Sequence, residues 1–242
     1  MTPKEYKLEA GEPIVTFNNF FTEYSRFHMD ETNTIIHMLF IPVLVGTIMG
    51  IMQHCKPFYS YGLQINMTGE SPTVEFGHFT DTVKNTFFGG HEGIVLINNG
   101  LLFWTMCGTF YIISDFIVGF IAYFGGIGLY ALTLWLNSFD TVDGSILEGK
   151  MWTVMLCIHF FGWTTQFVGH GCYERRAPAI FTNFFFLFIA PFFVSLEMLK
   201  TCGYRKEEIR SLTKEVEADI AFYRLSKGYP MRKGICVKDK DY

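Results

Sequence analysis

The chain has 242 residues, of which 50% are apolar, 18% aromatic and 17% charged. A composition this apolar excludes an ordinary soluble domain of the same length. The formal net charge of −4 provides no basic surface, so we expect no nucleic-acid partner. The six cysteines are scattered without a paired spacing, which is typical of reduced packing residues rather than of a disulfide framework.

Five apolar runs are each close to the length of a membrane span. They are Ile35–Met52, Ile94–Ile113, Phe116–Leu136, Met151–Val168 and Ile180–Leu199. A helix needs about 20 residues to cross about 30 Å of hydrocarbon, and it satisfies its own backbone groups there. The sequence therefore predicts an all-α fold, a polytopic membrane helical bundle of four to five spans. Three glycines of the third run would permit close helix contact: Gly125, Gly126 and Gly128.

A polar insert, residues 54–93, follows the first run and predicts an extramembrane loop. Beyond Leu199 the chain becomes charged, and apolar side chains recur there at helical spacing. They are Ile209, Leu212, Val216, Ile220 and Tyr223. This periodicity predicts an amphipathic helix, either a solvated surface helix or a docking element. We therefore divide the chain into a membrane domain, residues 1–204, and a charged helical tail, residues 205–242.

The number of crossings decides which polar clusters can meet. If the first four runs each cross, the start of the first and the end of the fourth lie on the same side of the membrane. The fifth run leaves two alternatives. A full crossing would put the tail on the opposite side, whereas Pro191, which lacks a backbone donor, would break the run into a re-entrant hairpin and return the tail.

His28, Asn33 and His37 lie where the first run begins. In one continuous helix the two histidines would face opposite ways and lie about 13 Å apart. Asp30 or Thr32 is a suitable N-cap, however, and would start the helix after His28. His28 would then be free to fold back toward His37.

Gln166, His170 and Glu174 step by four residues at the end of the fourth run and share one helix face. His170 and Glu174 are spaced to ligate one ion. His159 lies about 16 Å away along the helix, so we expect a core histidine bonded to a neighbouring helix. Imidazole with carboxylate suits iron(II), and zinc is equally allowed. The alternative is that these side chains only tie the last two helices together.

Arg175 and Arg176 follow at the expected membrane border. A guanidinium can hold a carboxylate or a lipid phosphate through a bidentate fork. Alternatively, both side chains only anchor the helix end by extending to the membrane surface.

Two sequence blocks resemble the Mpo1-like family. The first is His28-x4-Asn33-x3-His37-x4-Pro42. The second runs through Trp163, Gln166, Phe167, Gly169, His170, Glu174, Arg176, Pro178 and Ala179. The likeness extends over roughly residues 20–204, interrupted by the polar insert.

The resemblance implies an iron(II)-dependent dioxygenase of the endoplasmic reticulum that shortens 2-hydroxy long-chain fatty acids by one carbon. It implies His28, His37 and His170 as iron ligands, with Glu174 as a ligand or as the group that orients one. Arg176 would clamp the substrate carboxylate. Two amides complete the predicted catalytic set: Gln166 and Asn33.

A different class of function also fits the sequence. The insert 54–93 and the tail 205–242 would dock other subunits, and the chain would be a non-catalytic subunit of a large membrane complex, for instance in the mitochondrial inner membrane. A lipid-binding or channel-like protein is a third reading, although few charges line the apolar runs. The expected partners are thus membrane lipids, a 2-hydroxy fatty acid or other membrane subunits.

Overall fold

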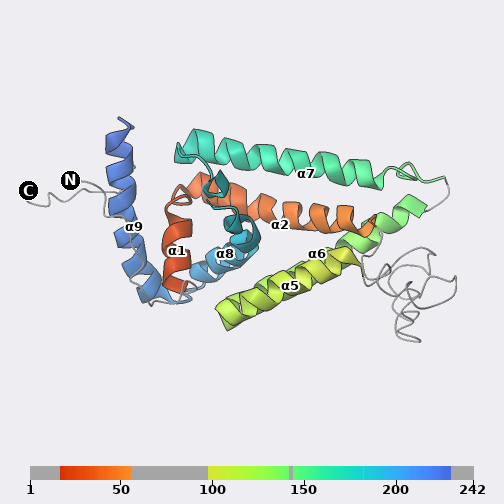
Figure 1. Ribbon diagram of the computed structural model, residues 1–242, viewed down its shortest axis with the longest axis horizontal. Helices are drawn as coiled ribbons and strands as arrows, with labels where there is room; N and C mark the ends of the chain where they lie inside the picture. Colours follow the sequence, from red (N-terminus) through yellow and green to blue (C-terminus); the bar gives the residue numbers. More distant parts are fainter. Residues whose placement is uncertain (1–16, 56–97, 142–143, 182, 230–242) are drawn as a thin grey trace, which may run out of the picture.

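The computed structural model describes residues 17–55, 98–141, 144–181 and 183–229. Within these ranges the protein contains helices and no strand, which confirms the predicted all-α class (Figure 1). All but the first two residues of the insert 54–93 lie outside the described residues, as does the end of the tail. The five cysteines within the ranges are free, but Cys107 alone among them is buried, so the expected packing role fits that residue only.

Seven helices and three short helical turns make up this part of the chain. The helices are α1 (Phe17–Ser25), α2 (Glu31–Gln53), α5 (Asn99–Ser114), α6 (Phe116–Ser138), α7 (Met151–Val168), α8 (Phe185–Thr201) and α9 (Lys206–Ser226). The turns are η1 (Phe139–Thr141), η2 (Gly169–Glu174), which is a π-helix, and η3 (Ala179–Phe181).

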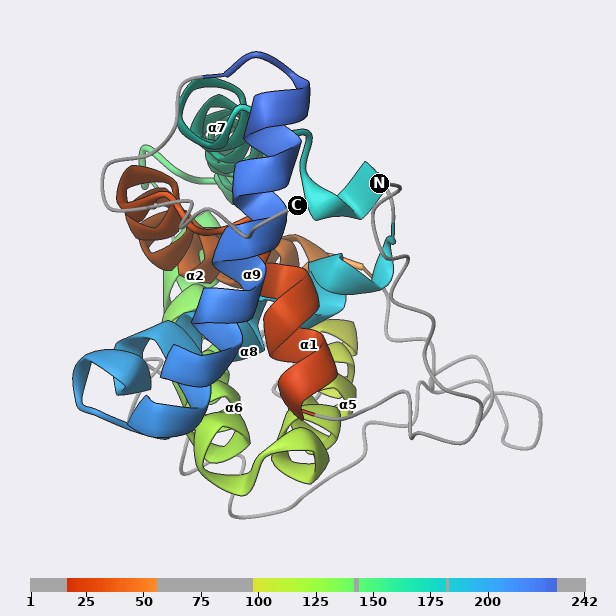
Figure 2. The same cartoon turned by 90° about the vertical axis from the view of Figure 1, so that its left-hand side faces the viewer.

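Helix α2 is the centre of the bundle and contacts α5, α6, α7 and α8. Successive long helices run in alternating directions, as side-chain contacts at the end of α2 show. Asn137, at the end of α6, donates to Gly50 and Gln53, while Met155, early in α7, lies beside Gly50. The start of α2 and the end of α7 therefore meet at the other end of the bundle. Figure 2 looks at that end, with α9 and α1 in front.

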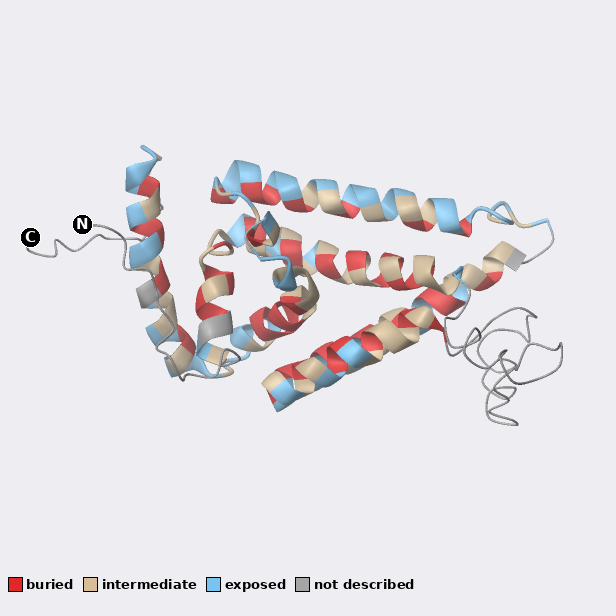
Figure 3. Cartoon of the chain, in the orientation of Figure 1, coloured by how far each residue is buried: buried red, intermediate tan, exposed pale blue. Residues whose placement is uncertain are grey.

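Two of the described helices, α2 and α6, are long and apolar enough to cross a membrane. A third span results only if α8 and α9, which are bent by 113° relative to each other, count as one. Large apolar side chains are exposed on α6 and α7, among them Phe120, Phe124, Phe160 and Phe161. Figure 3 shows the exposed face of α7, on the side turned away from α2. Apolar surface of this kind suits a lipid environment. The protein is thus membrane-associated, and the predicted count of four to five spans is not confirmed.

The chain bends after α8 and not at Pro191. Proline lies inside α8 without ending it, whereas Gly203 and Arg205 adopt left-handed backbone angles that end the helix and turn the chain. Arg205 then pairs with Asp115 at 2.7 Å, and Asp115 also caps the start of α6. The alternative in which Pro191 breaks the fifth run is therefore wrong about the residue at which the chain turns.

The tail helix α9 lies across the end of the bundle (Figure 1). It contacts α1 and buries Ile209, Val216 and Ile220, and Arg26 of α1 pairs with Asp219 at 2.9 Å. The apolar periodicity of the tail thus corresponds to an amphipathic helix, and that helix packs against α1 of the same chain. Its contact with α1 brings the tail back to the end where α2 begins.

Close contact between α5 and α6 depends on glycine, but not on all three glycines that the sequence suggested. A Cβ at Gly126 would lie 1.8 Å from the Trp104 ring, whereas one at Gly125 or Gly128 would meet no atom of the described residues within 4 Å. Trp104 donates from its indole nitrogen to the Tyr123 carbonyl at 2.9 Å. Gly126 therefore determines how the ring fits against α6.

We expect Gly126→Ala to lower the free energy of unfolding by about 1–3 kcal/mol, because the added methyl group collides with a buried ring. Gly128→Ala is the matched control, since its methyl meets open space and alanine favours a helix by up to ~1 kcal/mol. Thermal unfolding of both variants in the same detergent measures the difference. A Gly126→Ala variant as stable as Gly128→Ala would contradict this account of the α5–α6 contact.

Candidate metal centre

Three histidines from separate segments converge at one end of the bundle, hereafter the histidine end. His28 lies between α1 and α2, His37 lies in α2, and His170 lies in η2. One ring nitrogen of each lies within 4.8 Å of those of the other two. The ring centroids are 4.4 to 4.9 Å apart, and the rings meet edge to face. The topology thus unites the two polar clusters, as the sequence predicted.

The start of α2 explains how His28 reaches this cluster. Asp30 is the N-cap, and its side chain accepts from the backbone of Thr32 and Asn33. His28 therefore precedes the helix and folds back toward His37, as the capping signal indicated. Its ring stacks on Tyr24 with centroids 4.1 Å apart, and Tyr24 stacks in turn on Phe193 of α8 at 4.0 Å.

Hydrogen bonds fix the orientation of two imidazoles. Nδ1 of His28 lies 2.9 Å from the Tyr24 carbonyl, and Nδ1 of His37 lies 2.9 Å from the Asn33 carbonyl. A carbonyl can only accept, so each Nδ1 carries the proton and each Nε2 keeps its lone pair. Nδ1 of His170 is buried and has no hydrogen-bond partner among the described residues. This donor set fits a divalent metal ion.

Burial also keeps these rings neutral. It lowers the pKa of His28 well below its usual value, and the charges of His37 and His170 lower it further. Burial, followed by the charge of His37, lowers the pKa of His170 to about 3. Both rings are therefore uncharged at neutral pH, which is the form that binds a metal.

Gly169 allows the π-helix to approach α2. A Cβ at Gly169 would lie 2.5 Å from Oδ1 of Asn33. Asn33 is fully buried, and its Nδ2 donates to the Phe27 carbonyl at 3.3 Å, next to His28. Asn33 thus lies between the two segments that carry His28 and His170.

Glu174 supports the cluster from outside the ligand group. Its two carboxylate oxygens accept from the backbone nitrogens of Met29 at 2.7 Å and Asp30 at 3.0 Å. Of the two predicted roles, the geometry favours the orienting one, because the three-histidine group does not include this carboxylate. The regular α-helical spacing of four residues is lost in η2, because a π-helix has more residues in each turn than an α-helix.

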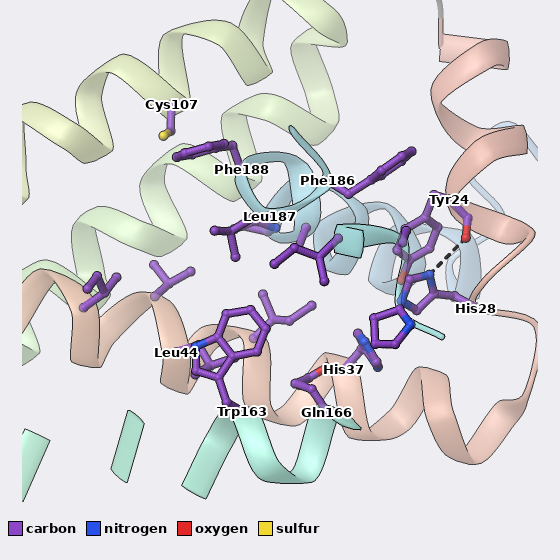
Figure 4. A pocket seen from close by; sticks show the side chains of 18 of the residues that line it. Tyr24, His28, His37, Leu44, Cys107, Trp163, Gln166, Phe186, Leu187 and Phe188 are labelled. Atoms are coloured by element: carbon purple, nitrogen blue, oxygen red, sulfur yellow. Dashed lines mark hydrogen bonds between the residues drawn. The ribbon is translucent and has the colours of Figure 1, made fainter. Parts of the chain in front are cut away.

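The histidines open onto an apolar cavity of ≈ 360 Å³ between α2, α5, α7 and α8 (Figure 4). Leu44 and Ile48 line it from α2, and Trp104 and Tyr111 line it from α5. The span from His37 to Ile48 along α2 is about 16 Å by helical rise. This volume lies in the usual range of small-ligand pockets, about 300–1,000 Å³.

Gln166 is a buried polar side chain in the wall of this cavity, beside the histidines. It is 4% exposed, and neither its amide nitrogen nor its amide oxygen has a hydrogen-bond partner among the described residues. His159 differs, because Thr47 and Trp163 bond its two ring nitrogens at 2.9 and 3.1 Å. The prediction of a satisfied core histidine is thus confirmed for His159.

Arg176 lies apart from the cavity, contrary to the expected clamp position. Its Nη1 donates to the Arg26 carbonyl at 3.0 Å, and its guanidinium lies 4.1 Å from the Phe27 ring centroid and 4.8 Å from that of Tyr223. The family resemblance implied Arg176 as the clamp, in the same sequence block as His170. The left-handed backbone of Arg175 turns the chain between them.

Sequence reasoning did not identify Tyr24, Phe193 or the cavity wall from α5. Tyr24 precedes His28 by four residues, a helical spacing that could have suggested contact. Phe193 and Trp104 carried no such signal, because they come from runs that looked uniformly apolar.

A bundle of apolar helices with a buried three-histidine group at the mouth of an apolar cavity defines a membrane-associated protein with a candidate metal centre. A family model described as 2-hydroxy-palmitic acid dioxygenase Mpo1-like matches residues 14–202. The chain therefore belongs to the Mpo1-like family. It is 23% identical over 208 residues to the 2-hydroxy-palmitic acid dioxygenase MPO1 of Saccharomyces cerevisiae, covering 86% of this chain and 93% of the relative. No solved structure matches the chain significantly.

Replacing His28, His37 or His170 by alanine should weaken metal binding by at least about 100-fold, because loss of an outer partner alone costs about 10–100-fold. The measurement is metal content of the purified protein, followed by titration with iron(II) and zinc. His54→Ala is the control, since His54 is exposed at the far end of α2. Undiminished metal binding in all three site variants would exclude this centre.

Proposed function

We propose that the protein is an iron(II)-dependent dioxygenase that removes one carbon from 2-hydroxy long-chain fatty acids. One observation carries the proposal: all three histidines line the same apolar cavity. The name of the yeast relative, which specifies 2-hydroxy-palmitic acid, supports the substrate class. An acyl chain would occupy the cavity and bring its carboxyl end to the histidines. Family resemblance further suggests the membrane of the endoplasmic reticulum as the location.

The iron would be held by His28, His37 and His170 through neutral ring nitrogens. When bound, iron(II) supplies the one-electron chemistry that dioxygen requires. The proposed reaction consumes the 2-hydroxy acid and dioxygen, and it yields the shortened acid, carbon dioxide and water. The apolar wall of the cavity excludes bulk water from the reacting end.

Gln166 would bind the polar head of the substrate. Its carboxamide offers both a donor and an acceptor, which match a hydroxyl group and a carboxylate. Leaving such a buried amide unpaired costs about 1–3 kcal/mol per group, and a substrate would recover part of this cost on binding. Glu174 and Asn33 would keep His28 in place during the reaction, through the bonds described above.

The direct test is aerobic turnover of 2-hydroxypalmitate by purified protein in detergent, with iron content measured on the same sample. We expect a fifteen-carbon acid as the product, and we expect a chelator to abolish its formation. Palmitate, which lacks the 2-hydroxyl group, is the control substrate and should give no product. A folded sample that holds no iron and forms no product would end this proposal and leave the non-catalytic subunit as the better account.

The Gln166→Leu variant tests whether Gln166 contributes to substrate binding and not to the stability of the fold. Leucine removes two unpaired polar groups, so the variant should be at least as stable as the parent. Its kcat/KM for 2-hydroxypalmitate should fall by about 10- to 100-fold, as expected from the loss of one or two hydrogen bonds to a charged group. Gln53→Leu is the matched control, because Gln53 bonds Thr133 and Asn137 and its loss should destabilise the fold. Unchanged kinetics in Gln166→Leu would contradict the role given to this amide.

A further inference from the structure

A second site lies at the histidine end, separate from the cavity and its histidines. A surface pocket of ≈ 470 Å³ lies between η2, the segment that follows it and the end of α9. Its polar wall consists of Arg175, Arg176, Tyr223 and Tyr229. A much smaller cavity of ≈ 10 Å³ adjoins it, and the charged or hydroxyl-bearing residues that line that space are Arg26, Glu174, Arg176, Tyr223 and Arg224. Arg176 and Tyr223 line both spaces, so four guanidiniums lie around these two adjoining pockets, and Arg26 alone among them has carboxylate partners in an ion pair within the described ranges.

Apart from Arg26, the arginines of this site lack the carboxylate partners that other arginines of the protein have. Arg26 pairs with Glu23 and Asp219, and Arg205 pairs with Asp115 and Glu208. Among the described residues, no ion pair involves Arg176 or Arg224. Unpaired guanidiniums that are partly or fully buried are costly, and they mark a place where an anion is expected.

Arg224 gives the second, independent sign of a ligand. Its side chain is 6% exposed, and its Nε is buried without a hydrogen-bond partner in the described part of the chain. Glu174 is the carboxylate that lines the same small cavity, but its two oxygens already accept from the backbone of Met29 and Asp30. Glu174 therefore offsets only part of the positive charge, because one carboxylate faces Arg175, Arg176 and Arg224 and its hydrogen-bonding capacity is largely used by the backbone.

The surroundings indicate which kind of anion would bind. Tyr173, Phe181 and Phe184 are exposed near the pocket along the chain, at 42%, 70% and 61%. Exposed aromatic rings beside arginine are typical of the membrane–water border. Phe167 and Pro178 form an apolar wall of the pocket, suited to the first carbons of an acyl chain. We propose that this pocket, the arginine pocket, binds the phosphate headgroup of an anionic phospholipid.

The proposed lipid site does not depend on the dioxygenase reaction. Its ligand chemistry is a phosphate oxygen held by forked guanidinium donors, in a pocket that Tyr223 and Tyr229 also line. The arginines lie outside the cavity that would hold the fatty acid. A bound lipid would also fasten the end of α9 to η2, the element that carries His170.

The test uses the full chain in mixed micelles that contain equal amounts of dioleoylphosphatidic acid and dioleoylphosphatidylcholine. Native mass spectrometry counts the lipids that remain bound. We expect phosphatidic acid to be retained in preference, and Arg176→Gln and Arg224→Gln to reduce its retention by about tenfold or more, as befits a lost charge-assisted bond. Arg210→Gln, which changes an exposed arginine of α9 away from the pocket, should retain it fully.

Two further variants keep the test decisive if Arg224→Gln fails to fold. Arg175→Asn changes an exposed residue whose left-handed backbone asparagine tolerates, and it should weaken retention. Arg176→Lys keeps the charge but loses the fork, so it should retain more lipid than Arg176→Gln. Equal retention of both lipids, or retention unchanged in every arginine variant, would overturn the proposal. Inorganic phosphate that binds without any preference for phosphatidic acid would overturn the lipid assignment.

Discussion

The histidine end is organised by one requirement: three imidazoles must lie together in an apolar interior without carrying charge. Burial lowers the pKa of His28 and His170, so neutral rings are the stable form. Two of the rings donate to carbonyls one helical turn before them, at Tyr24 and Asn33, which leaves their other nitrogens unprotonated. Neutral, oriented and converging rings are a metal-binding arrangement before any metal is present.

Other contacts at this end keep the segments that carry the three histidines, which are distant in sequence, in that arrangement. Glu174 binds the backbone that precedes α2, and Asn33 binds the turn beside His28. Gly169 allows Asn33 to lie against the π-helix, at a separation no larger side chain permits. These groups share partners, so losses at Glu174, Asn33 and Gly169 should not be additive.

The two proposed binding sites of the histidine end differ in the ligand that each would suit. The cavity is apolar apart from its histidines and Gln166, which suits a chain with a small polar head. The arginine pocket is cationic and open, and the wall residues Phe167 and Pro178 face both spaces. Helix α9 closes this end across the bundle, so the tail that the sequence set apart as a separate unit contributes to the site region.

Local patterns in the sequence predicted the helical class, the apolar helices, the cap at Asp30 and the candidate metal-binding histidines. Those features depend on local composition and spacing, which a chain carries without its fold. Contacts between segments set which of the three glycines of α6 lies against a ring, and they leave Gln166 without a hydrogen-bond partner among the described residues. They also place Glu174 beside the histidine group and not within it. The tertiary structure also places Arg176 outside the cavity, because a π-helix and a left-handed residue redirect the chain after His170. Contacts between distant segments set these outcomes, and helical periodicity carries no information about them.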